Sequence, residues 1–162
     1  MIESPFDTFP IDADERERNT MRGTKQSIEI AATPEQVWDV IVDFESYPSF
    51  VPNQTGATII ERAEGRWRVE FALSIAKRLR YTLDLEGERG RTLRWHLVDG
   101  DMMKENEGGW LLEPLPDGRT RATYDIAVEL KGFVPASVTN LLVAQTLPAN
   151  LQAFKDEAER RA

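Results

Sequence analysis

Cysteine is absent from the 162-residue sequence, and histidine occurs once, as His96. Without cysteine the chain has no disulfide bond, no thiolate nucleophile and no thiolate zinc site. One imidazole is also too few for the usual His-rich catalytic metal sites. We therefore expect neither a metal ion nor a cofactor.

Long hydrophobic runs are also absent. No stretch of about 18 consecutive apolar residues occurs, so no segment is expected to span a bilayer. The first ten residues, MIESPFDTFP, lack the basic and then apolar order of a secretion signal. We therefore predict a cytoplasmic location.

Positive charge is in short supply, since 28 acidic residues face 20 basic ones and the formal net charge is −8. A phosphate-binding surface needs clustered cations, so nucleic acid is not an expected partner. The cations of AKRLR, residues 76–80, could touch anionic lipid headgroups or RNA phosphates, but a solvated hairpin is the more common outcome on an acidic protein. A transient membrane or protein contact and the oligomeric state stay open.

The chain length suits one domain with a sizeable core. Residues 1–24 are rich in charge and lack hydrophobic patterning, and we interpret them as a flexible acidic tail. From Lys25 onward apolar residues alternate, with Ile28 and Ile30 on one face, as in a half-buried strand. Residues 25–162 are therefore predicted to form the folded domain.

A short helix is predicted to follow this strand. Thr33 has the features of an N-cap, Pro34 those of a first helical residue, and Gln36 those of the capping-box partner of Thr33. Helical spacing places these apolar residues on one side: Val37, Trp38, Ile41, Val42 and Phe44. Pro48 disfavours helical geometry at Tyr47, so the chain should turn there.

Alternating apolar stretches then continue to residue 130, with turn residues between them. This pattern is typical of an antiparallel meander of six strands. Turns at residues 64–65 and 116–118 divide two of the hairpins. Gly108 and Gly109 interrupt one strand, which predicts a bulge or sharp curvature there.

A final helix is predicted from Pro135 to Arg160, kinked near Pro148. The pattern as a whole predicts an α+β fold: one strand, two short helical pieces, six strands and one long helix. One helix cannot fill the concave face of seven twisted strands, so we expect a cavity of about 300–1,000 Å³ beneath it. Solid packing across that space, with no void large enough for even a small lipid, would contradict a binding function.

Three stretches resemble one protein family: IEIAATPEQVWDVIVDFESYPSFVPNQTGATIIER, LVDGDMMKENEGGWLLEPL and TLPANLQAFKDEAERR. Residues 25–160 are similar to the polyketide cyclase/dehydrase and coenzyme Q-binding family of START-like, helix-grip proteins. The resemblance implies a seven-stranded antiparallel curved sheet around a long C-terminal helix, in the order β-α-α-β6-α, with an apolar tunnel between them. It also implies lipids, quinones, isoprenoids or polyketides as ligands, or contacts with proteins and ribosomes, and the fold alone does not choose among these.

The family's aromatase/cyclases imply an arginine and aromatic residues on the fourth strand, where they line the cavity. The residues near that position here are Leu83, Asp84 and Leu85, and Arg80, by alternation with Tyr81, should face water. This departure favours noncatalytic binding or transport of a hydrophobic small molecule. A polyketide aromatase/cyclase or dehydratase is the alternative, and a protein- or ribosome-interaction module is the third.

In a cyclase, proton transfer would fall to Tyr81, Tyr124, Asp125 or His96. His96 is out of phase with the inward residue Trp95, so an ordinary exposed strand residue is the favoured interpretation. The acidic stretch DGDMMKENE lacks the glycine and the ligand offsets of a calcium loop, which favours a hairpin turn.

The expected ligand-binding residues are mostly apolar and lie on inward strand faces, in connections and on the final helix. They are Tyr47, Phe50, Trp67, Phe71, Tyr81, Leu83, Trp95, Met102, Met103, Trp110, Tyr124, Phe133, Leu141, Leu142 and Gln145. Met102, Met103 and Phe133 would form a lip at the entrance of the cavity, because apolar residues in connections between strands indicate such an entrance. Gln145 would bind a polar group of the guest. Ordinary core packing is the alternative for the aromatic and lip residues, and a solvent-facing amide is the alternative for Gln145.

The stretch FESYPSFVPN, residues 44–53, combines large apolar side chains with two prolines. Tyr47, Phe50 and Val51, held by Pro48 and Pro52, are predicted to plug the cavity at the end opposite the lip.

Overall fold

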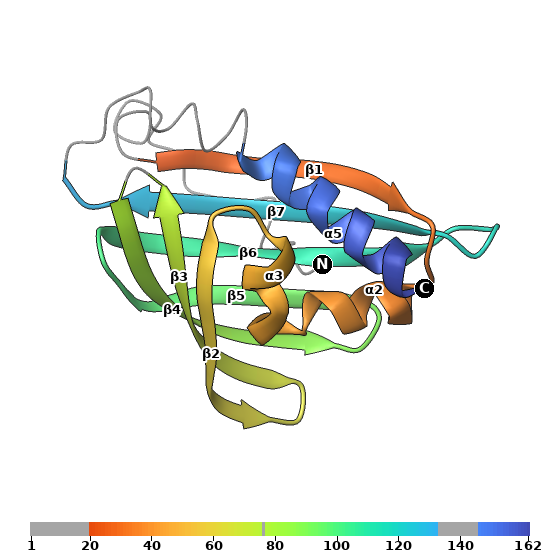
Figure 1. Cartoon of the computed structure of the whole chain (residues 1–162), viewed down its shortest axis with the longest axis horizontal. Coiled ribbons are helices and arrows are strands. Elements are labelled where there is room, and N and C mark those ends of the chain that lie inside the picture. The colour runs from red at the N-terminus through yellow and green to blue at the C-terminus, as the bar shows by residue number, and fades with distance from the viewer. Residues whose placement is uncertain (1–19, 76, 133–145) are drawn as a thin grey trace, which may run out of the picture.

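The computed structural model describes residues 20–75, 77–132 and 146–162, which form one curved sheet with helices across one face (Figure 1). Seven antiparallel strands are hydrogen-bonded in the order β1-β7-β6-β5-β4-β3-β2. Their bounds are β1 Thr20–Ile30, β2 Gln54–Ala63, β3 Arg66–Ile75, β4 Lys77–Glu88, β5 Thr92–Gly100, β6 Met103–Pro114 and β7 Thr120–Leu130. The predicted seven-stranded antiparallel sheet is confirmed.

The first strand is longer than its side-chain pattern indicated. β1 begins at Thr20, whereas the folded domain was expected from Lys25. Backbone pairing explains the difference, because Thr20 and Met21 lie opposite Glu129 and Val128 of β7. Such pairing needs no apolar alternation, so the sequence pattern does not reveal it.

Three short helical segments connect β1 to β2: α2 (Pro34–Ile41), the 3-10 helix η1 (Phe44–Ser46) and α3 (Tyr47–Phe50). The capping box of α2 forms as predicted, since Gln36 N donates to Thr33 Oγ1 and Thr33 N donates to Gln36 Oε1. Pro48 does not end a helix but lies in the first turn of α3, where a missing N–H is tolerated.

The C-terminal helix α5 spans Leu147–Arg161 and crosses the concave face of the sheet, as Figure 1 shows. Its buried residues are Leu147, Leu151, Phe154 and Ala158, the stripe expected from helical spacing. Pro148 lies in the first turn of α5. The predicted helix over residues 135–145, and the kink that would join it to α5, lie outside the described residues.

A glycine on β6 allows close packing rather than a bulge. Gly108 pairs in register with Ile126 of β7, and the register shift between these strands falls near Met103. Of the two predicted alternatives, the bulge is therefore wrong, and sharp curvature at this glycine stays a prediction. A Cβ atom on Gly108 would lie 2.1 Å from the Asp125 carbonyl oxygen and 2.9 Å from Cζ2 of Trp95. Glycine is needed there because β7 and the Trp95 ring approach too closely for a side chain.

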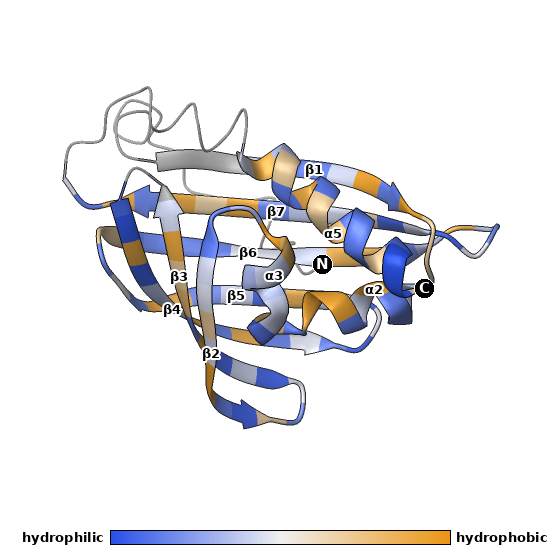
Figure 2. Ribbon diagram, in the orientation of Figure 1, coloured by the Kyte–Doolittle hydropathy of each residue, from blue (hydrophilic) through white to orange (hydrophobic). Residues whose placement is uncertain are grey.

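Hydrophobic and hydrophilic residues alternate along the strands (Figure 2), which gives the sheet two chemically different faces. On β4 the inward Tyr81, Leu83 and Leu85 are buried, while Asp84 and Glu86 between and beyond them reach the other side. Within the described ranges, no helix is long and apolar enough to cross a membrane.

Candidate functional site

A cavity of about 80 Å³ lies between the concave face of the sheet, the α3 region and α5. Its lining residues are Tyr47, Val51, Gln54, Phe71, Tyr81, Leu83, Leu85, Leu93, Trp95, Asn106, Trp110, Tyr124, Ile126, Asn150 and Phe154. The volume expected from the sequence was several times larger, and for this cavity that expectation is wrong. The space that is left is too small for even a small lipid, so the size expected for a binding cavity is not reached with the walls in this arrangement.

Aromatic rings occupy much of the space that the sheet curvature creates. Tyr47, Phe71 and Tyr81 form a stacked row, with ring centroids 5.8 and 5.4 Å apart. From α5, Phe154 packs edge-on against Tyr47 and Trp110, both at 5.2 Å. Strand residues alone pointed to a wide trough, but these rings fill it from both sides.

Two amide side chains bring polar atoms into this apolar cavity. Gln54 Nε2 donates to the Tyr81 hydroxyl at 3.0 Å, and Gln54 Oε1 is buried. Asn150 Oδ1 of α5 is buried as well. Neither oxygen has a hydrogen-bond donor in the part of the chain that the structure describes. A buried acceptor without a donor costs about 1–3 kcal/mol, so both are open positions for a guest.

A third amide in the lining is already satisfied. Asn106 Oδ1 accepts from Trp95 Nε1 at 3.0 Å, and Asn106 Nδ2 contacts Met103 Sδ at 3.9 Å. This pair holds the Trp95 ring in place as part of the wall. Its contrast with Gln54 and Asn150 marks those two as the unusual groups.

The cavity contains no group suited to accept a proton at neutral pH. Burial raises the pKa of Tyr81 to about 12, although the hydrogen bond from Gln54 lowers it slightly. Burial raises the pKa of Tyr47 and of Tyr124 as well, and nearby tyrosines add to both effects. The lining residues that the structure describes include no Asp, Glu, His, Lys or Arg. The tyrosines can therefore act only as neutral hydrogen-bonding groups.

Seven predicted site residues line this cavity: Tyr47, Phe71, Tyr81, Leu83, Trp95, Trp110 and Tyr124. Phe50 and Trp67 do not. Phe50 packs behind Phe154, with ring centroids 5.4 Å apart. Trp67 packs against Phe44 at 5.5 Å, toward α2. Both were assigned to the site because they are inward aromatics, yet neither is among the residues that line this space.

The predicted lip is only partly described. Met102 is 42% exposed and has a φ of +59°, and it stands in the turn between β5 and β6. Met103 is buried and contacts Asn106, so the two methionines do not form one exposed surface. The remaining predicted residues, Phe133, Leu141, Leu142 and Gln145, lie outside the described residues.

The predicted plug is at the wrong end. Val51 shortly precedes β2 and Met102 directly precedes β6, and these strands begin at the same end of the antiparallel sheet. Tyr47 and Val51 therefore line the cavity from the side on which Met102 lies, and not from the opposite end. The prolines indicated a turn but not its direction.

Eight lining residues are not among the predicted ligand-binding residues, and some of them have recognisable signals in the sequence. Asn106 shares the inward phase of Gly108 and Trp110 on β6. Asn150 lies four residues before Phe154 on α5, which places it on the buried face. Gln54, the first residue of β2, had no such signal, because its neighbours carry no clear alternation.

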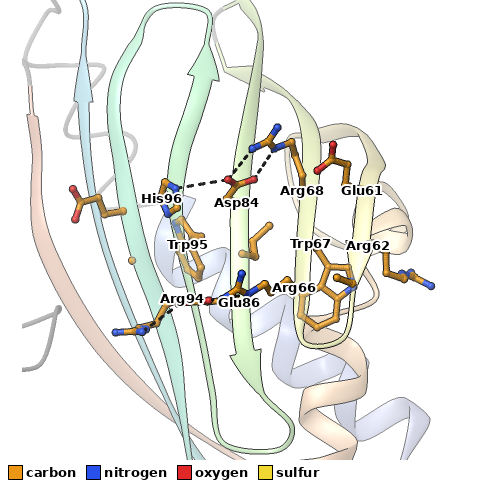
Figure 3. A pocket seen from close by; sticks show the side chains of 14 residues that line it. Glu61, Arg62, Arg66, Trp67, Arg68, Asp84, Glu86, Arg94, Trp95 and His96 are labelled. Carbon is orange, nitrogen blue, oxygen red and sulfur yellow. Dashed lines mark hydrogen bonds and ion pairs between the residues drawn. The ribbon is translucent and has the colours of Figure 1, made fainter.

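A second hollow, of about 810 Å³, lies on the outer face over β2 to β6 (Figure 3). Its most prominent groups are charged side chains from adjacent strands. Arg68 donates twice to Asp84, at 2.7 and 3.0 Å, and His96 Nε2 lies 3.8 Å from the same carboxylate. The Arg68 hydrogen bond is the main reason why the pKa of Asp84 is lowered. His96 is 68% exposed, as expected for an ordinary strand residue.

The next row of the outer face repeats this arrangement. Glu86 lies between Arg66, at 3.3 Å, and Arg94, at 3.6 Å, and all three are at least half exposed. Each carboxylate of the hollow's centre thus already has cationic partners. The outer hollow is large but open, wet and internally neutralised.

The chain matches known proteins over most of its length. A family described as polyketide cyclase/dehydrase and lipid transport matches residues 30–155. The ribosome association toxin RatA of Escherichia coli K12 is 29% identical over 96 residues, which are 59% of this chain and 60% of that protein. RatA of Vibrio cholerae is 24% identical over 110 residues, or 67% and 76% of the two chains. The chain thus spans less than two thirds of the length of the E. coli relative.

Solved structures agree with the sheet and helix arrangement. The aromatase/cyclase ZhuI of Streptomyces sp. R1128 has a TM-score of 0.77 at 20% identity, covering 86% of this chain and 94% of that one. A START superfamily protein of Mycobacterium smegmatis has a TM-score of 0.76 at 24% identity, covering 86% and 99%. A STAR-related lipid transfer protein of Xanthomonas axonopodis reaches 0.68 at 18%, covering 83% and 84%. The expected START-like, helix-grip fold is confirmed.

Proposed function

Since the chain belongs to the polyketide cyclase/dehydrase and lipid transport family, we propose that it binds a hydrophobic small molecule, without transforming it, in the cavity beneath α5. The observation that supports this most directly is the pair of buried, unpartnered amide oxygens, Gln54 Oε1 and Asn150 Oδ1. Folding alone gains nothing from them, because each would be better hydrated in the unfolded chain. A guest that supplies a donor would remove this disadvantage.

The small volume limits how a guest binds. A cavity of roughly 150 Å³ holds benzene, and the one beneath α5 measures about 80 Å³. A lipid-sized molecule therefore enters only when wall side chains or α5 move outward. Phe154 is the side chain best placed for this, because it fills the space between Tyr47 and Trp110.

The chemistry of the lining supports binding over a polyketide aromatase/cyclase or dehydratase. Such an enzyme needs a general base that can accept a proton near neutral pH. Of the four candidate proton carriers, only Tyr81 and Tyr124 line the cavity, and burial raises the pKa of both. His96 lies on the outer face beside Asp84.

Uptake of the neutral, fluorescent N-phenyl-1-naphthylamine tests the proposal. Saturable uptake is expected for the wild-type chain, and at least about tenfold weaker uptake for Leu83→Trp, whose larger ring would fill the cavity. Val98→Trp is the matched control, because Val98 is 43% exposed and does not line the cavity. Uptake that is absent, or equal in Leu83→Trp and wild type, would contradict the proposal. Native mass spectrometry of the purified chain would identify a copurifying guest.

The outer hollow supports a second candidate function, contact with a protein or ribosome. The relatives named ribosome association toxins suggest it, and Arg66 and Arg94 offer exposed guanidinium groups there. Cosedimentation with ribosomes should then weaken in Arg66→Glu plus Arg94→Glu and stay unchanged in Leu83→Trp. The reverse result would assign any such contact to the cavity, and no cosedimentation at all would remove this candidate.

A further inference from the structure

We propose that the cavity selects a neutral guest that donates a hydrogen bond, namely a phenol or an alcohol, over a hydrocarbon, an ether or a carboxylate of similar size. This inference rests on the proposed function and adds the chemical class of the guest. Three features of the lining support it: two amide oxygens that lack a hydrogen-bond donor, the hydroxyl group of Tyr81, and the absence of charged side chains among the described lining residues.

Gln54 and Tyr81 together present one acceptor and one donor. The Gln54 amide uses an N–H to donate to the Tyr81 hydroxyl oxygen, at 3.0 Å, which leaves Gln54 Oε1 without a donor. The Tyr81 hydroxyl accepts in that bond, so its own proton is not used there. At its raised pKa of about 12, Tyr81 keeps this proton at every physiological pH. A guest hydroxyl suits this pair because it both donates and accepts.

Asn150 adds a second acceptor from another element. It lies on α5, on the opposite wall from the strand residues, and its Oδ1 is fully buried without a donor among the described residues. Two acceptors from different elements favour a guest that carries a hydrogen-bond donor. An ether or a ketone offers only further lone pairs and leaves both amide oxygens unsatisfied.

The lack of positive charge in the described lining disfavours acidic guests. Among the described residues that line the cavity there is no Lys, Arg or His, so a carboxylate or phosphate would be buried there without a counter-ion. Its negative charge would also face the partial negative charges of Gln54 Oε1 and Asn150 Oδ1. Fatty acid anions are therefore poor candidates, whereas uncharged hydroxyl compounds fit.

A matched series of one-ring probes separates these possibilities: phenol, toluene, anisole and benzoate, at pH 7. Phenol and toluene have nearly the same shape, anisole is an acceptor without a donor, and benzoate is charged. Binding is measured by titration followed through the indole N–H signals in nitrogen–proton NMR spectra. Trp110 lines only the cavity and reports on it, whereas Trp95 lines both hollows. Trp67 lines only the outer hollow and reports on binding there, and Trp38, which lines neither, serves as the internal control.

Wild type is expected to bind phenol about tenfold or more tightly than toluene or anisole, and to ignore benzoate. The double variant Gln54→Leu plus Asn150→Leu should reverse this order, because its cavity is apolar and dry. Gln152→Leu is the matched control on α5, since Gln152 is exposed and bonded to Asp156. Thermal melting of each variant checks that it is folded.

Each other outcome has a distinct meaning. Toluene or anisole binding as tightly as phenol, benzoate binding, or an unchanged order in the double variant overturns the selectivity while leaving hydrophobic binding intact. Shifts in Trp38 and Trp67 alone would place binding elsewhere and overturn it too. If none of the four probes moves any indole signal, both the selectivity and the proposed function are contradicted.

Discussion

The two hollows of this sheet share strands β2 to β6 and the residues Leu85 and Trp95, but they differ in size, charge and exposure. The inner one measures about 80 Å³ and is lined by aromatic, aliphatic and amide side chains, with no charged side chain among its described residues. The outer one measures about 810 Å³ and is dominated by arginines and carboxylates. Neighbouring residues supply both, as Tyr81 and Leu83 face inward while Asp84 faces outward.

The comparison shows that size alone does not identify a binding site. In the outer hollow, Asp84 and Glu86 already have arginine partners in contact with water, so a guest would have to replace existing interactions. In the inner cavity, Gln54 Oε1 and Asn150 Oδ1 have nothing to replace. A ligand in the smaller cavity could therefore form hydrogen bonds without breaking existing ones.

The largest change is expected from opening the inner cavity. Phe154 is 6% exposed and packs against Tyr47, Phe50 and Trp110. Phe154→Ala should lower the free energy of unfolding by about 3–5 kcal/mol, because the packing is lost and a cavity is left. Urea denaturation measures this loss, with Gln152→Ala as the exposed control on α5. The cavity of Phe154→Ala should also bind larger ring probes than that of the wild type. An unchanged unfolding free energy would show that Phe154 is not part of the cavity wall.

A single added methyl group should disturb both hollows at once. Gly108→Ala places a Cβ atom against the Asp125 carbonyl oxygen and the Trp95 ring. We expect a loss of about 3 kcal/mol in unfolding free energy, since the strands must separate to relieve the contact. Gly56→Ala is the control, because its Cβ would meet the Ala72 Cβ at an ordinary 3.4 Å. Equal effects of the two substitutions would contradict the close approach at Gly108.

Removing an unpartnered acceptor should stabilise the empty protein. Asn150→Leu eliminates the buried Oδ1 that lacks a donor, so the unfolding free energy should rise by about 1 kcal/mol. The exposed control Gln152→Leu should stay near zero. A loss of stability in Asn150→Leu would mean that the amide makes a contact worth keeping in the empty state, and the inner cavity would then lose its distinguishing feature.

The smallest effect is expected on the outer face, and it should depend on pH. The pKa of Asp84 is lowered from 3.8, chiefly by its hydrogen bond from Arg68, so the pair stabilises the fold above that value and loses its effect as the pH falls through the lower folded-state pKa. Asp84 is a third exposed, so Asp84→Asn should cost only about 0.5 kcal/mol at pH 7 and nothing at low pH. Unfolding curves at pH 7 and pH 2 measure the difference. A cost that does not shrink on acidification would point to packing instead of charge.

Local patterns predicted most of the elements. The capping box at Thr33 and Gln36, the hairpin turns and the buried stripe of α5 all depend on residues close together in sequence, and they appear as expected. The start of β1 was not predictable in this way, because it depends on pairing with β7, about a hundred residues away. The close packing at Gly108 was not predictable for the same reason, because the Trp95 ring that approaches it belongs to another strand.

Alternation along the strands determined which side chains face inward, since the two-residue period of a strand is local. It therefore identified Tyr81, Leu83 and Trp95 as cavity residues from the sequence alone. Only the tertiary structure decided how much room remains between them and which amides meet there without partners. Those properties depend on how Phe154 and Asn150 of α5 lie against distant strands, and a difference of one ring decides whether the space is filled or open.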